Sequence, residues 1–261
     1  MDPSGPDIED LFAPIRPTDT FGVLLSEARD VLTQVHAPVD AELWGSDMIG
    51  ALCESASDVP SVMTALTLTL VPAAEEKSTP DSLALLRIFG VVGDARLRAA
   101  ARAAADRVAA GGVADAKWAA VIGSPETRDC WHYADTGGRQ ESVTMTFSYP
   151  DGAIHAFSVL IDHYRGGKIK DIWVGDATGL VGKTEEAADA DPLVVFEPLT
   201  AEDALARLRK AAKAGECPQD PDQRDAVSAH RALLAARLET ELRRGGVAAV
   251  DHDRLAGHER V

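Results

Sequence analysis

The stretch ESVTMTFSYPDGAIHAFSVLID, residues 141–162, alternates apolar and polar side chains on both sides of a Pro-Asp-Gly sequence. Alternation with a period of two is typical of a strand with one buried face, and Pro-Asp-Gly strongly favours a turn. A three-residue loop would pair Tyr149 with Ala153. The following pairs would gather apolar side chains on one face: Phe147 with His155, Met145 with Phe157, and Val143 with Val159. On the other face Thr144 would meet Ser158, and a slip of one residue would mix the two faces.

The same alternation continues beyond this hairpin and predicts a four-stranded antiparallel meander over residues 129–175. The expected strands, joined by glycine-containing turns, cover residues 130–135, 141–149, 153–163 and 168–175. A two-residue Gly-Gly turn in the last hairpin would pair Ile161 with Ile172, which extends the apolar face. The same register sets Asp162 directly opposite Asp171, and like charges in that position repel each other.

Helical periodicity dominates the chain before the sheet. Residues 1–18 are rich in proline and lack a periodic pattern, so we expect a disordered arm there. From 19 to 122, apolar residues recur at intervals of three and four and predict a helical bundle, with a clear helix start at Thr79-Pro80. Residues 61–71, SVMTALTLTLV, fit either a strand or a helix, and their helical neighbours favour the helix.

The chain after the sheet is predicted to return to helices. Residues 176–192 are expected to form an acidic linker, and the next residues, LVVFEPL, a short strand or extended segment. We assign 193–261 to a C-terminal helical region with a long helix from Asp222 to Arg244. The predicted fold class is therefore α+β: an N-terminal helical bundle, a four-stranded antiparallel β-meander, and C-terminal helices packing on the sheet. Because both faces of the sheet are partly apolar and need cover, we expect one compact unit.

Composition limits the classes of function. The formal net charge of −16 disfavours nucleic-acid binding, although a local basic patch at Arg165, Lys168 and Lys170 could act against that average. The three cysteines are widely spaced and form no Cys-X-X-Cys sequence, so we expect neither disulfides nor a structural zinc site. No apolar run is long enough for a membrane span, and the acidic N-terminus is unlike a secretory signal. We therefore expect a soluble cytoplasmic protein.

The second face of the predicted sheet is unusually aromatic for a solvent face and too polar for an ordinary core. We interpret it either as a packing surface half covered by a helix from one end of the chain, or as a ligand or partner surface. The candidate anchors for a partner are Trp131, Tyr133, Leu160, Tyr164 and Trp173. The leading functional hypothesis is a non-enzymatic protein-interaction module that binds a protein partner on this face.

The paired aspartates motivate the alternative hypothesis, a metal-dependent hydrolase. Two carboxylates on adjacent strands could hold Mg²⁺ or another divalent cation, and Asp176 could add a third ligand to Asp162 and Asp171. The competing explanation is that nearby basic residues at the hairpin end neutralise the pair: Arg165, Lys168 or Lys170.

The remaining motifs give weaker indications of a functional site. His155 and His163 fall at opposite ends of one strand, too far apart to share a metal, and are expected to be polar caps of the core. Cys130 and His132 share a face, but no third group that would orient a catalytic pair is evident. The sequence GLVGKT, residues 179–184, lacks the first glycine of a phosphate-binding loop at the required spacing. No catalytic residue is assigned.

Overall fold

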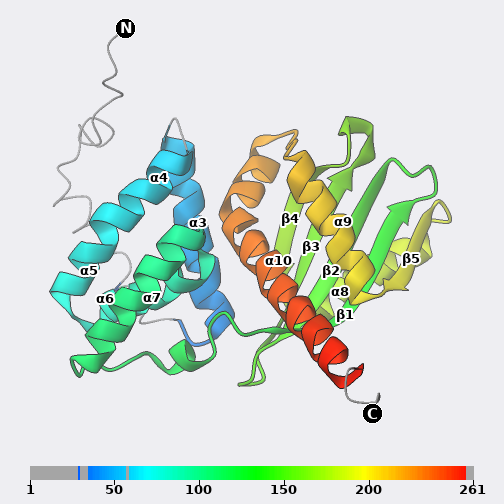
Figure 1. Cartoon of the computed structure of the whole chain (residues 1–261). Helices are drawn as coiled ribbons and strands as arrows, with labels where there is room; N and C mark the ends of the chain where they lie inside the picture. The colour runs from blue at the N-terminus through cyan, green and yellow to red at the C-terminus, as the bar shows by residue number, and fades with distance from the viewer. Residues whose placement is uncertain (1–28, 30–34, 57–58, 257–261) are drawn as a thin grey trace, which may run out of the picture. The chain divides into compact units, whose positions relative to one another are not determined.

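The computed structural model describes residues 29, 35–56 and 59–256. The contacts between residues divide the chain into two compact units, with the boundary in the sequence between Ile122 and Gly123 (Figure 1). The sequence predicts a single compact unit, because both partly apolar faces of the sheet need helices to cover them. The predicted disordered arm, 1–18, and the start of the predicted helical region lie outside the described residues.

The first unit is helical, as predicted. Its elements are α3 (Pro38–Ser55), α4 (Val59–Ala65), the π-helical turn η1 (Leu66–Leu70), α5 (Val71–Lys77), α6 (Pro80–Val92), α7 (Ala95–Ala110) and the short 3₁₀ turn η2 (Lys117–Ala120). The helical interpretation of 61–71 is confirmed, with the alternating Leu-Thr residues forming the π turn. The predicted start signal also holds, because Thr79 Oγ1 accepts a hydrogen bond from the Ser82 backbone N–H at 3.2 Å.

The core of the first unit is aliphatic. Helix α6 carries a continuous set of fully buried apolar side chains: Leu83, Leu85, Leu86, Ile88 and Phe89. Gly45 of α3 explains the close approach of α3 to α6, since a Cβ atom there would lie 2.2 Å from the side chain of Ile88. Small residues on α7 serve the same purpose, with Ala101 and Ala104 fully buried against the bundle.

The second unit is built on an antiparallel sheet of five strands in the order β4-β3-β2-β1-β5. The strands are β1 (Glu126–Asp135), β2 (Gln140–Ser148), β3 (Ile154–Asp162), β4 (Lys168–Gly175) and β5 (Val194–Leu199). The first four form the predicted meander. The fifth, which the sequence left as a strand or an extended segment, pairs with β1 at the far edge.

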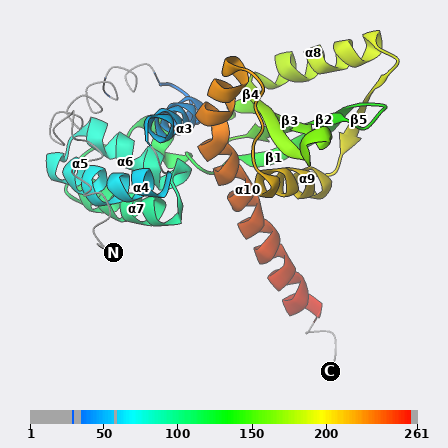
Figure 2. The ribbon, with the colours of Figure 1, turned by 90° about the horizontal axis from the view of Figure 1, so that it is seen from above.

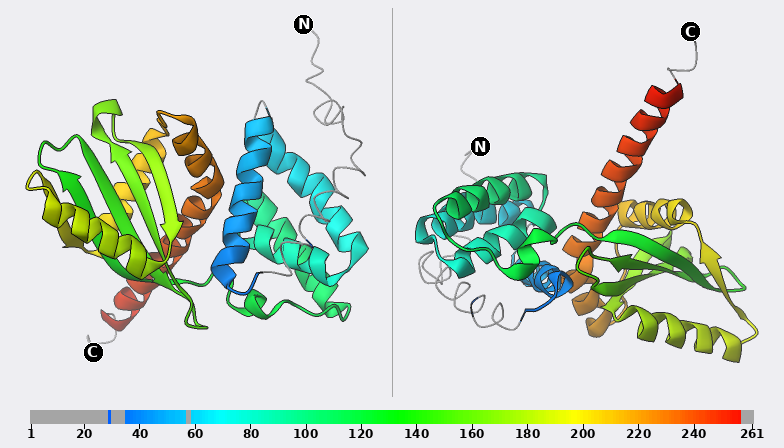
Figure 3. Two further views of the ribbon diagram at one scale, coloured as in Figure 1. Left: turned by 180° about the vertical axis from the view of Figure 1, so that it is seen from behind. Right: turned by 90° about the horizontal axis from the view of Figure 1, so that it is seen from below.

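Helices cover both faces of this sheet. Helix α8 (Ala177–Ala190) crosses one face between β4 and β5, whereas α9 (Ala201–Ala214) and α10 (Pro221–Ala256) lie on the other face (Figures 2 and 3). We call the α8 side the outer face and the α9 side the inner face. The inner face holds the predicted apolar core, including Val143, Val159 and Ile172. Within the described residues, no helix is both long and apolar enough to cross a membrane.

Helix α8 occupies the stretch that was predicted to be an acidic linker. Asp176 caps it by accepting a hydrogen bond from the Gly179 backbone N–H at 2.6 Å. None of the residues of α8 is buried, so the apolar periodicity that normally reveals a helix is weak there. The linker prediction is corrected by this helix, whose acidic residues remain exposed or half-exposed.

The predicted register of the central hairpin is confirmed. Tyr149 donates its backbone N–H to Ala153 at 2.8 Å, and the pairs Phe147–His155, Met145–Phe157, Val143–Val159 and Thr144–Ser158 all occur.

The predicted register of the last hairpin is wrong. The connection is not a two-residue turn made by Gly166 and Gly167 alone, because a 3₁₀ turn over His163–Arg165 precedes them. Asp162 caps this turn by accepting a hydrogen bond from the Arg165 backbone N–H at 3.2 Å. Asp162 therefore pairs with Lys168. Farther along β4 a bulge shifts the register again, and Asp171 pairs with Leu160. The two like charges are therefore not opposite each other.

Candidate functional site

Four of the five predicted anchor residues share the outer face. His132 points to the inner face, where its ring contacts Glu141, so its neighbours Trp131 and Tyr133 point to the α8 side. The register places Trp173 in the same cross-strand row as Trp131, through Thr144 and Ser158, and Leu160 in the row of Tyr133, through Ser142. The fifth, Tyr164, lies in the 3₁₀ turn beyond the sheet and is 84 % exposed.

The outer face has large side chains at its sides and small hydroxyl side chains in the middle. Strands β2 and β3 contribute a buried set of these: Ser142, Thr144, Thr146, Ser148 and Ser158. Thr144 Oγ1 and Ser158 Oγ lie 2.8 Å apart and satisfy each other. Thr146 Oγ1 accepts the Asp129 backbone N–H at 3.0 Å, and Ser148 Oγ accepts from Arg128 at 2.6 Å, so most of these hydroxyls are paired within the sheet. The large side chains at the sides of the face are left for other contacts. Trp173 remains 40 % exposed there.

Sequence reasoning missed the contribution of β5 to this margin. Phe196 lies directly opposite Tyr133, and Pro198 lies opposite Trp131. The segment was recognisable as extended, but its partner strand could not be read from local periodicity, because β5 returns to the sheet only after α8.

The cover over the outer face is light. Helix α8 packs against β3 and β5, yet every one of its residues is exposed or half-exposed. Gly182 sits in the helix interior with open space where a Cβ atom would be, so close packing does not explain the glycine. The outer face is thus covered by a helix, as one interpretation expected, but by residues 177–190 rather than by an end of the chain.

The three candidate metal ligands have separate structural roles. Asp162 caps the 3₁₀ turn and also accepts a hydrogen bond from Gln140 Nε2 at 3.4 Å. Asp171 accepts the Ile172 backbone N–H at 2.8 Å, and burial, reinforced by the charge of Asp220, raises the pKa of its carboxyl. Asp176 caps α8. Among the described residues, no group of three or more His, Cys, Asp or Glu side chains is arranged so that it could hold a metal ion.

The predicted neutralisation of the aspartates takes a different form. Arg165 reaches Asp162 through its backbone N–H, and Lys168 faces Asp162 across the hairpin as its register partner. Lys170 is one of several charged neighbours of Asp171, and it favours the ionised carboxylate against the effect of burial. The hairpin therefore separates the two acids and gives each its own partners.

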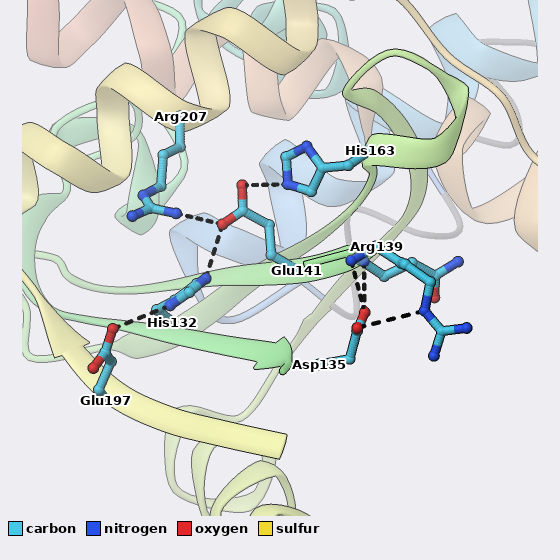
Figure 4. Close-up of polar contacts among 8 residues, drawn as sticks. His132, Asp135, Arg139, Glu141, His163, Glu197 and Arg207 are labelled. Carbon is cyan, nitrogen blue, oxygen red and sulfur yellow. Dashed lines mark hydrogen bonds and ion pairs between the residues drawn. The ribbon is translucent and has the colours of Figure 1, made fainter. Parts of the chain in front are cut away.

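The inner face holds a polar cluster centred on the buried carboxylate of Glu141 (Figure 4). His132 Nε2 lies 2.8 Å from Glu141 Oε2, and His163 Nε2 lies 3.1 Å from Oε1. Arg207 of α9 also donates to Glu141 Oε2. On its other side, His132 Nδ1 lies 3.4 Å from Glu197 of β5. The cluster joins β1, β2, β5, the 3₁₀ turn and α9.

This cluster has the chemistry of a structural clamp. Both ring nitrogens of His132 face carboxylates, so neither is directed at a substrate-sized opening. Cys130, the residue that shares its face, has a thiol whose pKa burial raises to about 11, which opposes formation of the nucleophilic thiolate. The sequence placed His163 at the rim of the core, but it gave no signal that Glu141 and Arg207, far apart in the chain, would meet.

A second buried polar group lies under α10. Arg237 donates from Nη2 to Tyr149 Oη at 2.7 Å and sits over the rings of Phe147 and Tyr149. His155 stacks between these two rings, and burial together with the charge of Arg237 lowers its pKa to about 3. His155 is thus a neutral core residue, in keeping with its predicted place on the core face.

An open pocket of about 770 Å³ lies where the start of β1 meets the turn between β2 and β3. In its lining, Arg128 donates to Ser148 Oγ at 2.6 Å and lies 3.7 Å from Glu126, whereas the buried Thr127 Oγ1 has no hydrogen-bond partner among the described residues. The aromatic residues of the outer face do not line this pocket. Comparison of the chain with protein-family models, with curated proteins and with solved structures found no match.

Proposed function

We propose that residues 123–261 form a non-enzymatic binding module whose outer face receives a protein partner. The observation that carries this proposal is Trp173 of β4, a large apolar side chain that is 40 % exposed on a face where, among the described residues, the lightly packed α8 is the cover. Tryptophan and tyrosine combine a large apolar area with a polar tip, and such residues provide most of the binding energy at protein interfaces. Trp131, Tyr133, Leu160 and Phe196 complete the apolar margin.

The pKa shifts and hydrogen bonds of the titratable groups support a binding function rather than catalysis. A catalytic acid, base or nucleophile needs a pKa suited to its task and an opening toward substrate. Here burial lowers the pKa of His155 to about 3 and raises that of Cys130 to about 11, so each is held in its neutral form. The carboxylates of Asp162 and Asp176 hold a turn and a helix end. These groups have structural roles.

The test compares capture of partners by the wild-type chain, by Trp173→Ala and by Val59→Ala. Val59 is a matched control, because it is an apolar residue of equal exposure, 40 %, in the other unit. We expect a partner that binds the wild-type and Val59→Ala chains and is lost from Trp173→Ala, with binding then measured on the purified pair. Equal recovery by all three chains would argue against the outer face, and unfolding of Trp173→Ala would make Trp173 a core residue.

A further inference from the structure

The two edge strands of the sheet, β4 and β5, differ in what pairs with their outer sides. At the β4 edge, residues 215–217 run alongside the strand, where Ile169 donates its N–H to Gly215 O at 2.9 Å and accepts from Cys217 N at 2.7 Å. At the other edge, β5 pairs with β1 on one side. Within the part of the chain that the structure describes, no strand pairs with the other side of β5. An open strand edge readily accepts another strand.

The open edge is apolar and bounded. Leu193 is 66 % exposed and Val195 is 40 % exposed, both on the inner-face side. Pro192 and Pro198 stand immediately outside the five residues 193–197. Because proline has no N–H to donate to a ladder, pairing along this edge is restricted to the residues between them. The midpoint of that stretch is Val195.

A second copy of the same chain fits this edge. In a two-fold antiparallel pairing centred on Val195, that residue lies opposite its own copy, Val194 lies opposite Phe196, and Leu193 lies opposite Glu197. Both prolines fall outside the pairing. The single carboxylate of the stretch, Glu197, does not meet itself, and His132 of its own chain lies 3.4 Å from it. The register thus joins apolar residues at its centre, sets Leu193 against Glu197 at each end, and avoids the like-charge pair that would oppose it.

We propose that two copies of this chain associate through β5 and form a continuous antiparallel sheet of ten strands, twice the five of one chain. Among the described residues, Ile169 of the β4 edge is already paired and α10 packs against β4, which leaves β5 as the open edge, so the association closes at a dimer. The contact is short, and we expect a dissociation constant on the order of 10–100 µM, as for interfaces below the standard size. Because each chain carries a net charge of −16, added salt strengthens the dimer by screening the repulsion.

Sedimentation equilibrium of the full chain from about 1 µM to 1 mM tests this proposal, since that range brackets the expected constant. The wild-type mass should rise from 27.6 kDa toward twice that value, and more completely at higher salt. Val195→Lys, which places two lysines opposite each other, should remain monomeric. Ile154→Lys is the control, because Ile154 is an exposed apolar residue at 58 % on another strand, and it should dimerise like the wild type. A monomeric wild type, or a dimer that Val195→Lys leaves intact or that both variants abolish, overturns the proposal.

Disulfide trapping tests the register even if Val195→Lys fails to fold. In a background in which Cys53 and Cys217 are replaced by serine, Val195→Cys should form a covalent dimer on mild oxidation. Val194→Cys faces Phe196 of the other copy and should link at least tenfold more slowly. Cys130 is buried and stays in both variants. Equal linking rates, or no linking at position 195, contradict the pairing.

Discussion

Asp162 pairs with Lys168 across the last hairpin, so the acid that the sequence set against Asp171 faces a base instead. The change follows from the side chain of Asp162 itself. Its Oδ1 atom accepts the Arg165 N–H and thereby stabilises a 3₁₀ turn, which lengthens the connection and shifts the register of β4. Turn geometry thus avoids the repulsion between the two aspartates that the predicted register implied.

Divalent cations are expected to leave stability unchanged. A site that binds metal only in the folded state would raise the melting temperature in proportion to its occupancy. Because Asp162, Asp171 and Asp176 are separated by their structural roles, melting scans with Mg²⁺, Mn²⁺ or Ca²⁺ at millimolar concentration should overlay the scan with chelator. A rise in melting temperature that Asp171→Asn removes would restore the hydrolase hypothesis.

Loss of the Glu141 charge should destabilise the second unit. Glu141→Gln keeps the shape but leaves Arg207 and two histidines around a neutral group, and we expect a loss of about 1–3 kcal/mol, since Arg207 is partly exposed. Urea unfolding followed by tryptophan fluorescence measures this difference. Glu126→Gln is the control, because its ion pair with Arg128 is solvent-exposed at 3.7 Å and should change stability by less than about 0.5 kcal/mol. Equal effects of the two variants would contradict the clamp.

His155 should make the fold sensitive to acid. Its pKa is about 3 in the folded chain, below the ordinary value of 6.5, so the unfolded chain binds this proton more readily. The stabilising contribution of neutral His155 is complete above pH 6.5 and is lost progressively as the pH falls toward 3. His155→Phe should flatten the dependence of the unfolding free energy on pH between those values. An unchanged slope would show that His155 is not buried as a neutral ring.

Asp171 should oppose stability at neutral pH. Burial raises the pKa of its carboxyl in the folded chain, so the folded state binds the proton more tightly and stability falls as the pH rises through that window. Asp171→Asn removes the buried charge and should raise the melting temperature at pH 7 while leaving it nearly unchanged well below the ordinary aspartate pKa of 3.8. A lower melting temperature at pH 7 would indicate that the charge stabilises the bulge.

The covering helix should be easy to strengthen. Gly182 has room for a Cβ atom, and replacing a helix-interior glycine by alanine typically contributes about 0.5–1 kcal/mol. Gly182→Ala should therefore slow amide hydrogen exchange across α8 without slowing it in the core strands β2 and β3. Exchange in α8 as slow as in those strands, in the wild type, would contradict a lightly held cover.

Much of the fold could be predicted from the local pattern of apolar, polar and turn-forming residues in the sequence. The β2–β3 register followed from two constraints that agree, a turn of defined length and an alternation that one slip would destroy, and it was predicted correctly down to Thr144 opposite Ser158. The last hairpin had the same alternation but a turn that a side chain could remodel, and there the prediction failed at Asp162. Helix α8 was missed because no residue in it is buried, so its sequence lacks the apolar stripe on which helix prediction depends.

The side-chain clusters of the second unit could not be predicted from local sequence pattern, for a different reason. Glu141 and Arg207 are 66 positions apart, and their contact depends on which face α9 covers. The shared face of Trp131, Tyr133, Leu160 and Trp173 could be predicted, because strand alternation alone puts them on one side of the sheet. Phe196 could not, since its place depends on the return of β5 to the far edge of the sheet.

Site-specific photo-crosslinking in cells tests most directly whether the outer face binds a partner, with benzoylphenylalanine in place of Trp173 and, separately, in place of Val59. A ketone at an interface position links covalently to the partner that touches it. A third variant carries the same replacement at Phe196. We expect a discrete adduct from position 173, the same adduct from position 196, and none from position 59. Adducts that are absent from 173 and 196, or as abundant at 59, would contradict a binding surface on the outer face.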